Sequence, residues 1–95
     1  MRPRKTDKNQ ASIVRALNQI PGVSVADTHS LGKGFPDICI GHKGRNFLIE
    51  LKNPSQPRSA QQLTDAENRF HRAWQGRILT VTTLDEILKT LDIQT

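Results

Sequence analysis

Two short apolar runs on either side of a glycine-containing turn constrain this 95-residue chain most strongly. Residues 37–40 (DICI) and 47–52 (FLIELK) each have the length and the β-branched and aromatic content of a strand. The segment 41–44 between them (GHKG) is typical of a turn. The pattern therefore predicts a β-hairpin.

The register of this hairpin brings charged residues together. A turn centred between Lys43 and Gly44 places Asp37 opposite Glu50. Side chains alternate between the two faces of a strand, so Glu50 and Lys52 point the same way. Two facing carboxylates repel each other unless a cation lies between them. The hairpin is therefore predicted to carry two carboxylates and an ammonium on one face, at one end.

Such a cluster predicts a divalent-metal site. Mg²⁺ prefers oxygen ligands, and Asp37 and Glu50 are candidate ligands, with the Leu51 carbonyl as a possible third. Lys52 could orient or deprotonate a metal-bound water and stabilise charge on a phosphate. The alternative is a solvent-facing salt-bridge cluster, and spacing alone does not decide. The unusual chain entry through residues 34–36 (GFP) and the apolar flanking strands favour the metal site.

The rest of the chain alternates helical and strand patterns. Strands are predicted at residues 23–26 and 77–82. The first of three predicted helices runs from Thr6 or Asp7 to about Ile20 and has a buried stripe of Ile13, Ala16, Leu17 and Ile20. The second runs from a Thr64–Glu67 capping box to about Trp74, is closed by Gly76, and has Phe70, Ala73 and Trp74 on its apolar side. The third begins with a Thr83–Glu86 capping box and has a stripe of Ile87, Leu88 and Leu91. The element order is αβββαβα, which is an α/β fold in a single domain, residues 1–95.

Composition limits the partners and the compartment. The net charge of +5 suits a polyanion, although it also fits a merely soluble surface. The single cysteine, Cys39, excludes an internal disulfide framework, fits a reducing cytoplasm and is predicted to be a buried small hydrophobe. No apolar stretch approaches the length of a membrane span, and residues 1–6 are predicted to be a flexible basic arm without a secretory signal.

These residues resemble a known nuclease signature. Residues 34–38 (GFPDI) and 49–52 (IELK) are similar to the PD-(D/E)xK nuclease motif. Further residues match the VRR-NUC family: Pro57, Arg58, Ser59, Ala60, Leu63, Thr64, Glu67, Phe70, His71, Trp74 and Gly76. With them, the chain resembles the short stand-alone form of this family that is typical of phages and prophages. The resemblance covers roughly residues 10–90.

The resemblance implies a restriction-endonuclease-like αβββαβ core with a mixed central sheet, followed here by a C-terminal helix. It implies hydrolysis of DNA phosphodiester bonds with Mg²⁺ or Mn²⁺ by a homodimer in the cytoplasm of a bacterial host cell. The expected partner is branched or duplex DNA, with structures such as Holliday junctions or flaps as the expected substrates. Asp37 and Glu50 would be metal ligands and Lys52 the catalytic lysine. No organic cofactor and no membrane partner are expected.

The chain departs from the family in two places. Many relatives carry a Glu in the first helix, where Gln10 is the best-aligned candidate, so a second metal position is in doubt. Relatives often carry Gln where Glu67 stands, and Glu67 either closes its capping box alone or also faces the active site.

Several other residues are candidates for DNA contact, and each also has a plain structural interpretation. His29 and Ser30 could contact phosphate or metal-bound water, or form an ordinary loop pair, and Lys33 could approach the DNA backbone between two glycines or be a solvated turn residue. The remaining candidates are Arg4, Lys5 and Arg58. His71 is predicted to be a packing or surface histidine rather than a catalytic base. Trp74 is predicted to lie in the core or a dimer interface rather than to stack on bases.

Two alternatives to the nuclease remain open. The first is a catalytically weak or inactive nuclease-fold module that only binds DNA, for which the missing helical Glu is the motive. The second is an RNA or replication-accessory binder that uses the basic surface alone.

Overall fold

The computed structural model describes residues 8–57 and 62–93, and these form an α/β fold with a four-stranded mixed sheet and three helices. In chain order the elements are α1 (Lys8–Asn18), β1 (Val23–Asp27), a 3-10 turn η1 (His29–Leu31), β2 (Ile38–His42), β3 (Arg45–Leu51), α3 (Asp65–Ala73), β4 (Ile78–Val81) and α4 (Leu84–Leu91). The predicted order of helices and strands is confirmed. The Thr6 or Asp7 cap predicted for α1 lies outside the described residues.

The strands lie in the order β1-β2-β3-β4, with β1, β2 and β3 antiparallel and β4 parallel to β3. The β2–β3 turn has two residues, Lys43 and Gly44, whose φ angles are 51° and 76°. Positive φ at both central positions suits the right-handed twist of a hairpin. Ile38 therefore pairs with Ile49, which confirms the predicted register. The strands extend to His42 and from Arg45, beyond the predicted limits at Ile40 and Phe47.

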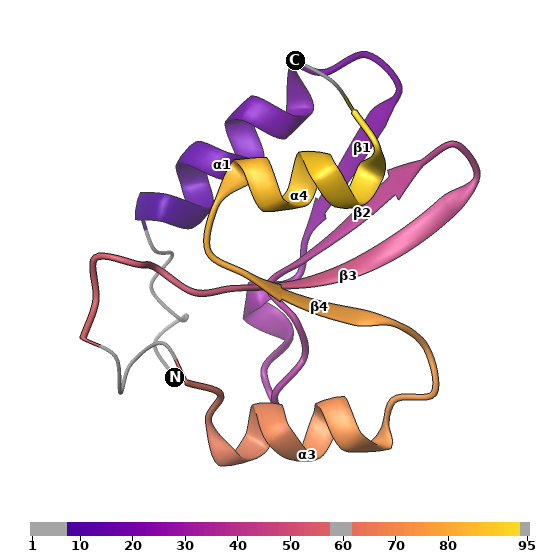
Figure 1. Ribbon diagram of the computed structural model, residues 1–95. Coiled ribbons are helices and arrows are strands. Elements are labelled where there is room, and N and C mark those ends of the chain that lie inside the picture. The colour runs from indigo at the N-terminus through magenta and orange to yellow at the C-terminus, as the bar shows by residue number, and fades with distance from the viewer. Residues whose placement is uncertain (1–7, 58–61, 94–95) are drawn as a thin grey trace.

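The hydrophobic core lies between one face of the sheet and helices α1 and α4 (Figure 1). The predicted helix stripes are largely confirmed, because the core contains Ile13, Leu17, Ile38, Ile40, Phe47, Ile49, Val81, Ile87, Leu88 and Leu91. Each such side chain contributes about 1.5–3 kcal/mol on burial. Ala16 and Ile20 are only half-buried.

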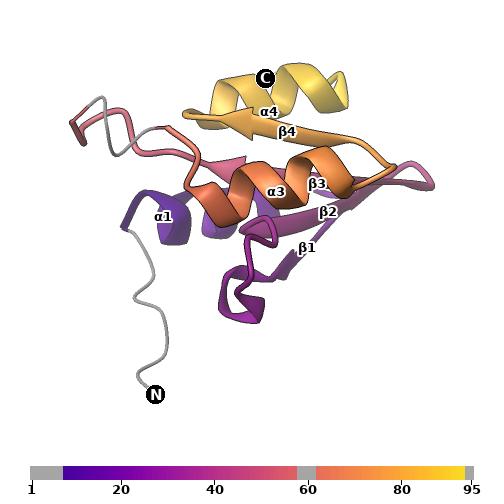
Figure 2. The same ribbon diagram turned by 90° about the horizontal axis from the view of Figure 1, so that it is seen from below.

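Helix α3 lies on the other face of the sheet (Figure 2). Its predicted capping box is present, because the Thr64 side chain accepts from the Glu67 N–H and the Glu67 side chain accepts from the Thr64 N–H. Its predicted apolar side is wrong at Ala73 and Trp74, which are exposed. Trp74 is the C-cap, 44% exposed, and it stacks on Phe70 at 5.3 Å instead of entering the core.

Three smaller predictions are also corrected. Cys39 is half-buried, because it lies on the sheet face away from the main core. Gly76 does not close α3, since the helix ends at Ala73 and the C-cap N–H of Trp74 bonds to the Phe70 carbonyl. At α4, Thr83 accepts from the Glu86 N–H as predicted, but the Glu86 carboxylate accepts from Thr82 N–H. None of the described helices has the length and apolar character needed to cross a bilayer.

Candidate metal centre

Asp37 is fixed at the entry to β2 by two bonds to β3. Its N–H donates to the Ile49 carbonyl at 3.0 Å, and its Oδ2 accepts from the Leu51 N–H at 2.8 Å. The Asp37 side chain thus takes the place of a backbone acceptor in the ladder. Pro36 before it is fully buried and has no N–H to satisfy. The sequence GFP-D therefore places a carboxylate at the end of β3.

Glu50 and Lys52 share that end of the strand and are buried with Asp37. The exposed fractions are 6% for Asp37, 1% for Glu50 and 9% for Lys52. Lys52 Nζ lies 3.9 Å from Glu50 Oε2. Its backbone N–H donates to the Val81 carbonyl at 2.9 Å, continuing the pairing with β4. A solvent-facing salt-bridge cluster does not describe residues this deeply buried.

Glu67 of α3 joins the cluster from across the sheet face. Its Oε1 accepts from the Thr64 N–H at 2.8 Å and from Lys52 Nζ at 2.9 Å, and the residue is 2% exposed. One carboxylate oxygen therefore caps the helix and also anchors the lysine. The interpretation that Glu67 only closes its capping box is therefore wrong, because the residue also contacts Lys52 of the cluster.

Gly34 explains how α3 comes so close to this end of the sheet. Its φ is 81°, and a Cβ added there would lie 2.2 Å from the Ala66 carbonyl oxygen. Only glycine allows the loop before β2 to touch the first turn of α3 in this way. The same loop carries Asp37, so one close contact positions Asp37 and Glu67 together.

The pKa values of the buried Glu50 and Glu67 carboxyls are shifted in opposite directions. Burial, a hydrogen bond with Asp37 and the negative charges of Asp37 and Glu67 raise the pKa of Glu50 to about 10, against a smaller lowering effect of Lys52. Burial also opposes ionisation of Glu67, but hydrogen bonds from Lys52 and the Thr64 N–H outweigh it and lower the Glu67 pKa. Without a metal, Glu50 therefore holds a proton at neutral pH beside ionised Glu67.

The donor set fits a divalent cation held by few protein ligands. Asp37 and Glu50 offer hard oxygen donors, and Glu50 Oε1 is buried without a hydrogen-bond partner in the described part of the chain. Within residues 8–57 and 62–93, no three His, Cys, Asp or Glu side chains form a group able to hold a metal ion. The fit is thus to a site of two carboxylates completed by backbone oxygen and water, with no cage of side chains.

Gln10 is buried, but it belongs to a neighbouring polar group. Its Nε2 donates to Asp27 Oδ1 at 3.3 Å. Asp27 Oδ1 also accepts from the His29 N–H at 3.2 Å and pairs with His29 Nδ1 at 2.5 Å. Burial opposes ionisation of Asp27, yet the bonds with His29 outweigh it and lower its pKa. The bond with Asp27 gives no support to the prediction that Gln10 completes the metal site with Asp37 and Glu50.

The sequence interpretation missed Asp27. The available signal was an acidic residue directly after the alternating segment 23–26, on the strand that pairs with β2. Of the other predicted DNA contacts, Ser30 and Lys33 are exposed, Lys33 with a φ of 55°. Arg4, Lys5 and Arg58 lie outside the described residues.

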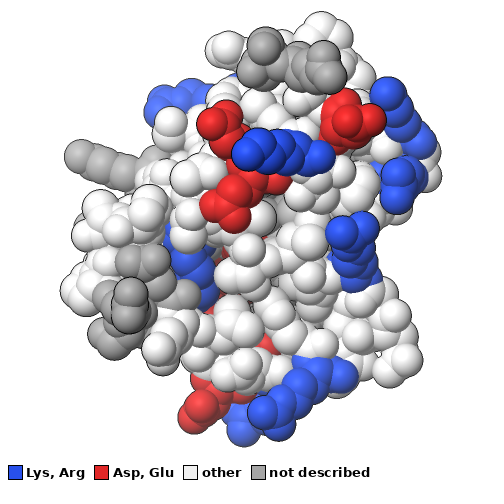
Figure 3. Space-filling model, in the orientation of Figure 1, with Lys and Arg blue, Asp and Glu red and all other residues white. Residues whose placement is uncertain are grey.

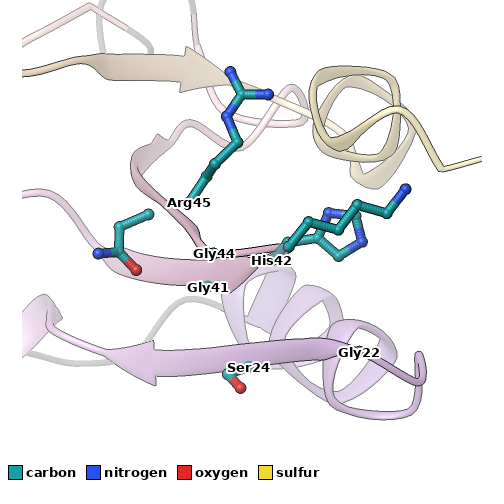
Figure 4. Close-up of a pocket in the computed structure, with 8 residues that line it drawn as sticks. Gly22, Ser24, Gly41, His42, Gly44 and Arg45 are labelled. Atoms are coloured by element: carbon teal, nitrogen blue, oxygen red, sulfur yellow. The ribbon is translucent and has the colours of Figure 1, made fainter.

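A pocket lies at the opposite end of β3 from the Asp37–Glu50 cluster. This open pocket of 330 Å³ is formed by the β2–β3 turn, with Lys43 and Arg45, and by the start of β1, with Gly22 and Ser24. Arg45 and Ser24 point to opposite sides of the sheet (Figure 4). No carboxylate lines the pocket, so it is basic and separate from the Asp37–Glu50 cluster.

Comparison with known proteins gave no match: no family model, no curated protein and no solved structure is similar to the chain at a significant level.

Proposed function

We propose that this protein is a metal-dependent DNA endonuclease of the VRR-NUC type, with a restriction-endonuclease-like core. The observation that carries the proposal is the burial of Asp37, Glu50 and Lys52 together at the end of β3. Charged side chains rarely lie at such depth unless they are paired or bind a ligand. Lys52 is paired with Glu67, whereas Glu50 Oε1 has no hydrogen-bond partner among the described residues. The order of elements and the parallel β4 also support this core.

In this proposal the carboxylates and the lysine of the centre have separate roles. Asp37 and Glu50 would hold the divalent ion, Mg²⁺ or Mn²⁺, with the Leu51 carbonyl as a third protein ligand. When bound, the ion polarises the scissile phosphate and lowers the pKa of a coordinated water. Asp37 is already immobilised by the Leu51 N–H, so this ligand needs little reorganisation. As a ligand of the ion, Glu50 would be ionised.

Lys52 stabilises negative charge that develops on the phosphate. Its ammonium is held at 2.9 Å by Glu67, which limits the rotamer freedom of a long side chain. Glu67 does not touch the phosphate in this scheme. It is a positioning residue that acts through Lys52.

The substrate class follows from charge. The chain carries a net charge of +5, which favours a polyanion. Lys and Arg side chains line the edge of the molecule over the β2–β3 hairpin, whereas acidic side chains gather over α4 (Figure 3). The resemblance to the VRR-NUC family motivates the narrower proposal of branched DNA, cut by a homodimer that presents two active sites.

A cleavage panel tests the proposal. Four-way junction, flap and linear duplex are incubated with Mn²⁺ and with wild type, Asp37→Ala, Lys52→Ala or the exposed control Asp85→Ala. We expect wild type and Asp85→Ala to cut branched DNA, and both site variants to lose at least about a thousandfold in rate.

A catalytically weak DNA-binding module is the second candidate. It is favoured by one observation, the engagement of Gln10 with Asp27, which leaves the centre without a helical ligand. If wild type and both site variants bind junctions equally and none cuts with any divalent metal, this candidate replaces the nuclease.

A further inference from the structure

One large aromatic ring near the centre lies at the surface and is held in place by three neighbours. Trp74, the C-cap of α3, is 44% exposed. Phe70 stacks on it with the ring centroids 5.3 Å apart and the planes 18° from parallel, and Phe35 meets it edge-on at 6.3 Å. A Cβ added at Gly76 would lie 2.7 Å from the indole Nε1, so the chain after the helix also fits closely against the ring. The protein therefore presents a fixed aromatic side chain to solvent.

The open part of this ring suits a flat partner. Phe70 occupies one face of Trp74, so another ring can stack only on the second face. Aromatic rings stack with an offset, and every nucleic-acid base offers a π-face to such a contact. A base inside a duplex is covered on both faces by its neighbours, whereas an unpaired base can be splayed out onto an aromatic side chain. Trp74 therefore fits an unpaired base better than duplex DNA.

The surroundings of the ring are basic. Arg69, Arg72 and Arg77 are exposed, and residues 68–77 include no Asp or Glu. Basic side chains lie over α3 at the bottom of the molecule (Figure 3). Proteins bind single-stranded nucleic acid by combining such cations, which contact phosphates, with rings on which bases stack. A twofold contact between two copies centred on Trp74 would instead bring the arginines of both copies together, with no acidic residue of this segment to pair them. The charge therefore favours a polyanion over a second copy of the chain.

Two contacts connect the ring to the candidate metal centre. Phe35, which touches the ring, lies two residues before Asp37. Glu67 holds α3 to the centre through its bond with Lys52 Nζ at 2.9 Å. Seven residues separate Glu67 from Trp74, which corresponds to about 10 Å along a helix axis. About three stacked nucleotides of one DNA strand have that rise. A base on the ring and a phosphate at the centre can therefore belong to the same strand.

We propose that Trp74 is a stacking site for one unpaired DNA base beside the metal centre, and that Arg69, Arg72 and Arg77 contact the flanking phosphates. The choice of DNA, and of a nearby scissile phosphate, rests on the proposed function. The stacking site deepens that function, because it makes the protein prefer DNA with a single-stranded arm, such as a flap, to fully paired duplex.

Binding of a short single strand in EDTA, where no metal supports cleavage, tests the stacking site. The chain has one tryptophan and no tyrosine, so its emission reports on Trp74 alone. Wild type is titrated with a thymidine oligonucleotide and with an abasic oligonucleotide of the same length and charge. We expect the thymidine strand to quench the emission and to bind at least about fivefold more tightly than the abasic strand, which is the lower end of the contribution of one stacked base.

Anisotropy of a labelled strand extends the test to variants. Trp74→Leu should bind the thymidine strand at least about fivefold more weakly than wild type, and the abasic strand equally well. Trp74→Phe keeps a ring, so its affinity should stay within about threefold of wild type. The control is Leu31→Ala, which removes the other large apolar side chain exposed in the described part of the chain and should bind like wild type.

The outcomes separate the stacking site from the nuclease. Equal affinity of wild type for the thymidine and abasic strands overturns the stacking site. So does a Trp74→Leu variant that binds both strands like wild type, and if that variant sediments as a monomer where wild type is a dimer, the ring is a contact between copies. Cleavage of branched DNA with Mn²⁺ in either case leaves the nuclease standing without the stacking site. Ring-dependent strand binding without cleavage in any divalent metal leaves the stacking site on a DNA-binding module.

Discussion

Replacing Glu50 with glutamine should make the metal-free protein more stable at neutral pH. Glutamine has nearly the same shape and keeps a donor for the bond with Asp37, but it cannot ionise. Glu50 holds its proton in the fold, where burial and the neighbouring carboxylates raise its pKa to about 10, but loses it in the unfolded chain above about pH 4.5. The unfolded state therefore binds fewer protons, and stability falls as pH rises from 4.5 towards 10.

The magnitude follows from that interval. Each pH unit corresponds to at most about 1.4 kcal/mol for one group. Between pH 4.5 and pH 7 the destabilisation by Glu50 reaches about 3 kcal/mol at most. We expect glutamine to recover about 1–3 kcal/mol, which is roughly 5–20 °C in melting temperature for a domain of this size.

Urea unfolding from pH 5 to pH 8 in EDTA measures the difference in stability between Glu50→Gln and wild type. The probe is the fluorescence of the single tryptophan, Trp74. The matched control is Glu86→Gln on α4. Hydrogen bonds from Thr82 lower the pKa of Glu86, so its ionised form stabilises the fold above pH 4.5 and the control should lose stability. The two substitutions should therefore act in opposite directions.

The reasoning fails if Glu50→Gln is no more stable than wild type at pH 8. It also fails if the stability difference between the two proteins does not grow from pH 5 to pH 8. Either result would mean that Glu50 is ionised in the metal-free fold.

Three further predictions concern the groups around the centre. Glu67→Ala should lower the free energy of unfolding by about 3 kcal/mol or more and remove nearly all cleavage, because the cap disappears and the buried lysine loses its partner. Glu67→Gln keeps both accepted hydrogen bonds, so its cleavage rate should stay within about tenfold of wild type. Urea unfolding and cleavage rates check both variants. Charge reversal at Lys43 and Arg45 should weaken junction binding at least tenfold and reduce the salt dependence by about two counterions, measured by titration at several salt concentrations, while metal binding is unchanged. Gly34→Ala should destabilise the fold by about 3 kcal/mol or more because of its close approach to α3, whereas Gly22→Ala, with a similar φ and open space around it, should lose only about 1 kcal/mol in the same assay.

Local signals were enough to predict the hairpin. Lys43-Gly44 suits a two-residue turn, and that turn alone set the register that brings Asp37 to the end of β3. The capping box of α3 was equally local, since Thr64 and Glu67 lie three residues apart. In both cases neighbouring residues carry the whole interaction.

Other features depend on the position of α3 against the sheet, which no local sequence pattern predicts. Glu67 reaches Lys52 only because Gly34 lets the helix approach the sheet. His71 Nε2 lies 4.0 Å from Glu50 Oε1 for the same reason, whereas the sequence predicted a packing or surface histidine. Trp74 was predicted to lie in the core or at a dimer interface; it does not enter the core, because the helix ends there and leaves it stacked at the surface.

Stability and cleavage measured on one preparation of Glu50→Gln test the central claim most directly. The account predicts a protein more stable than wild type without metal that cuts a four-way junction with Mn²⁺ at least about a thousandfold more slowly. Loss of activity in a stabilised protein cannot be attributed to unfolding. Cleavage at the wild-type rate by this variant would show that Glu50 is not part of a nuclease centre.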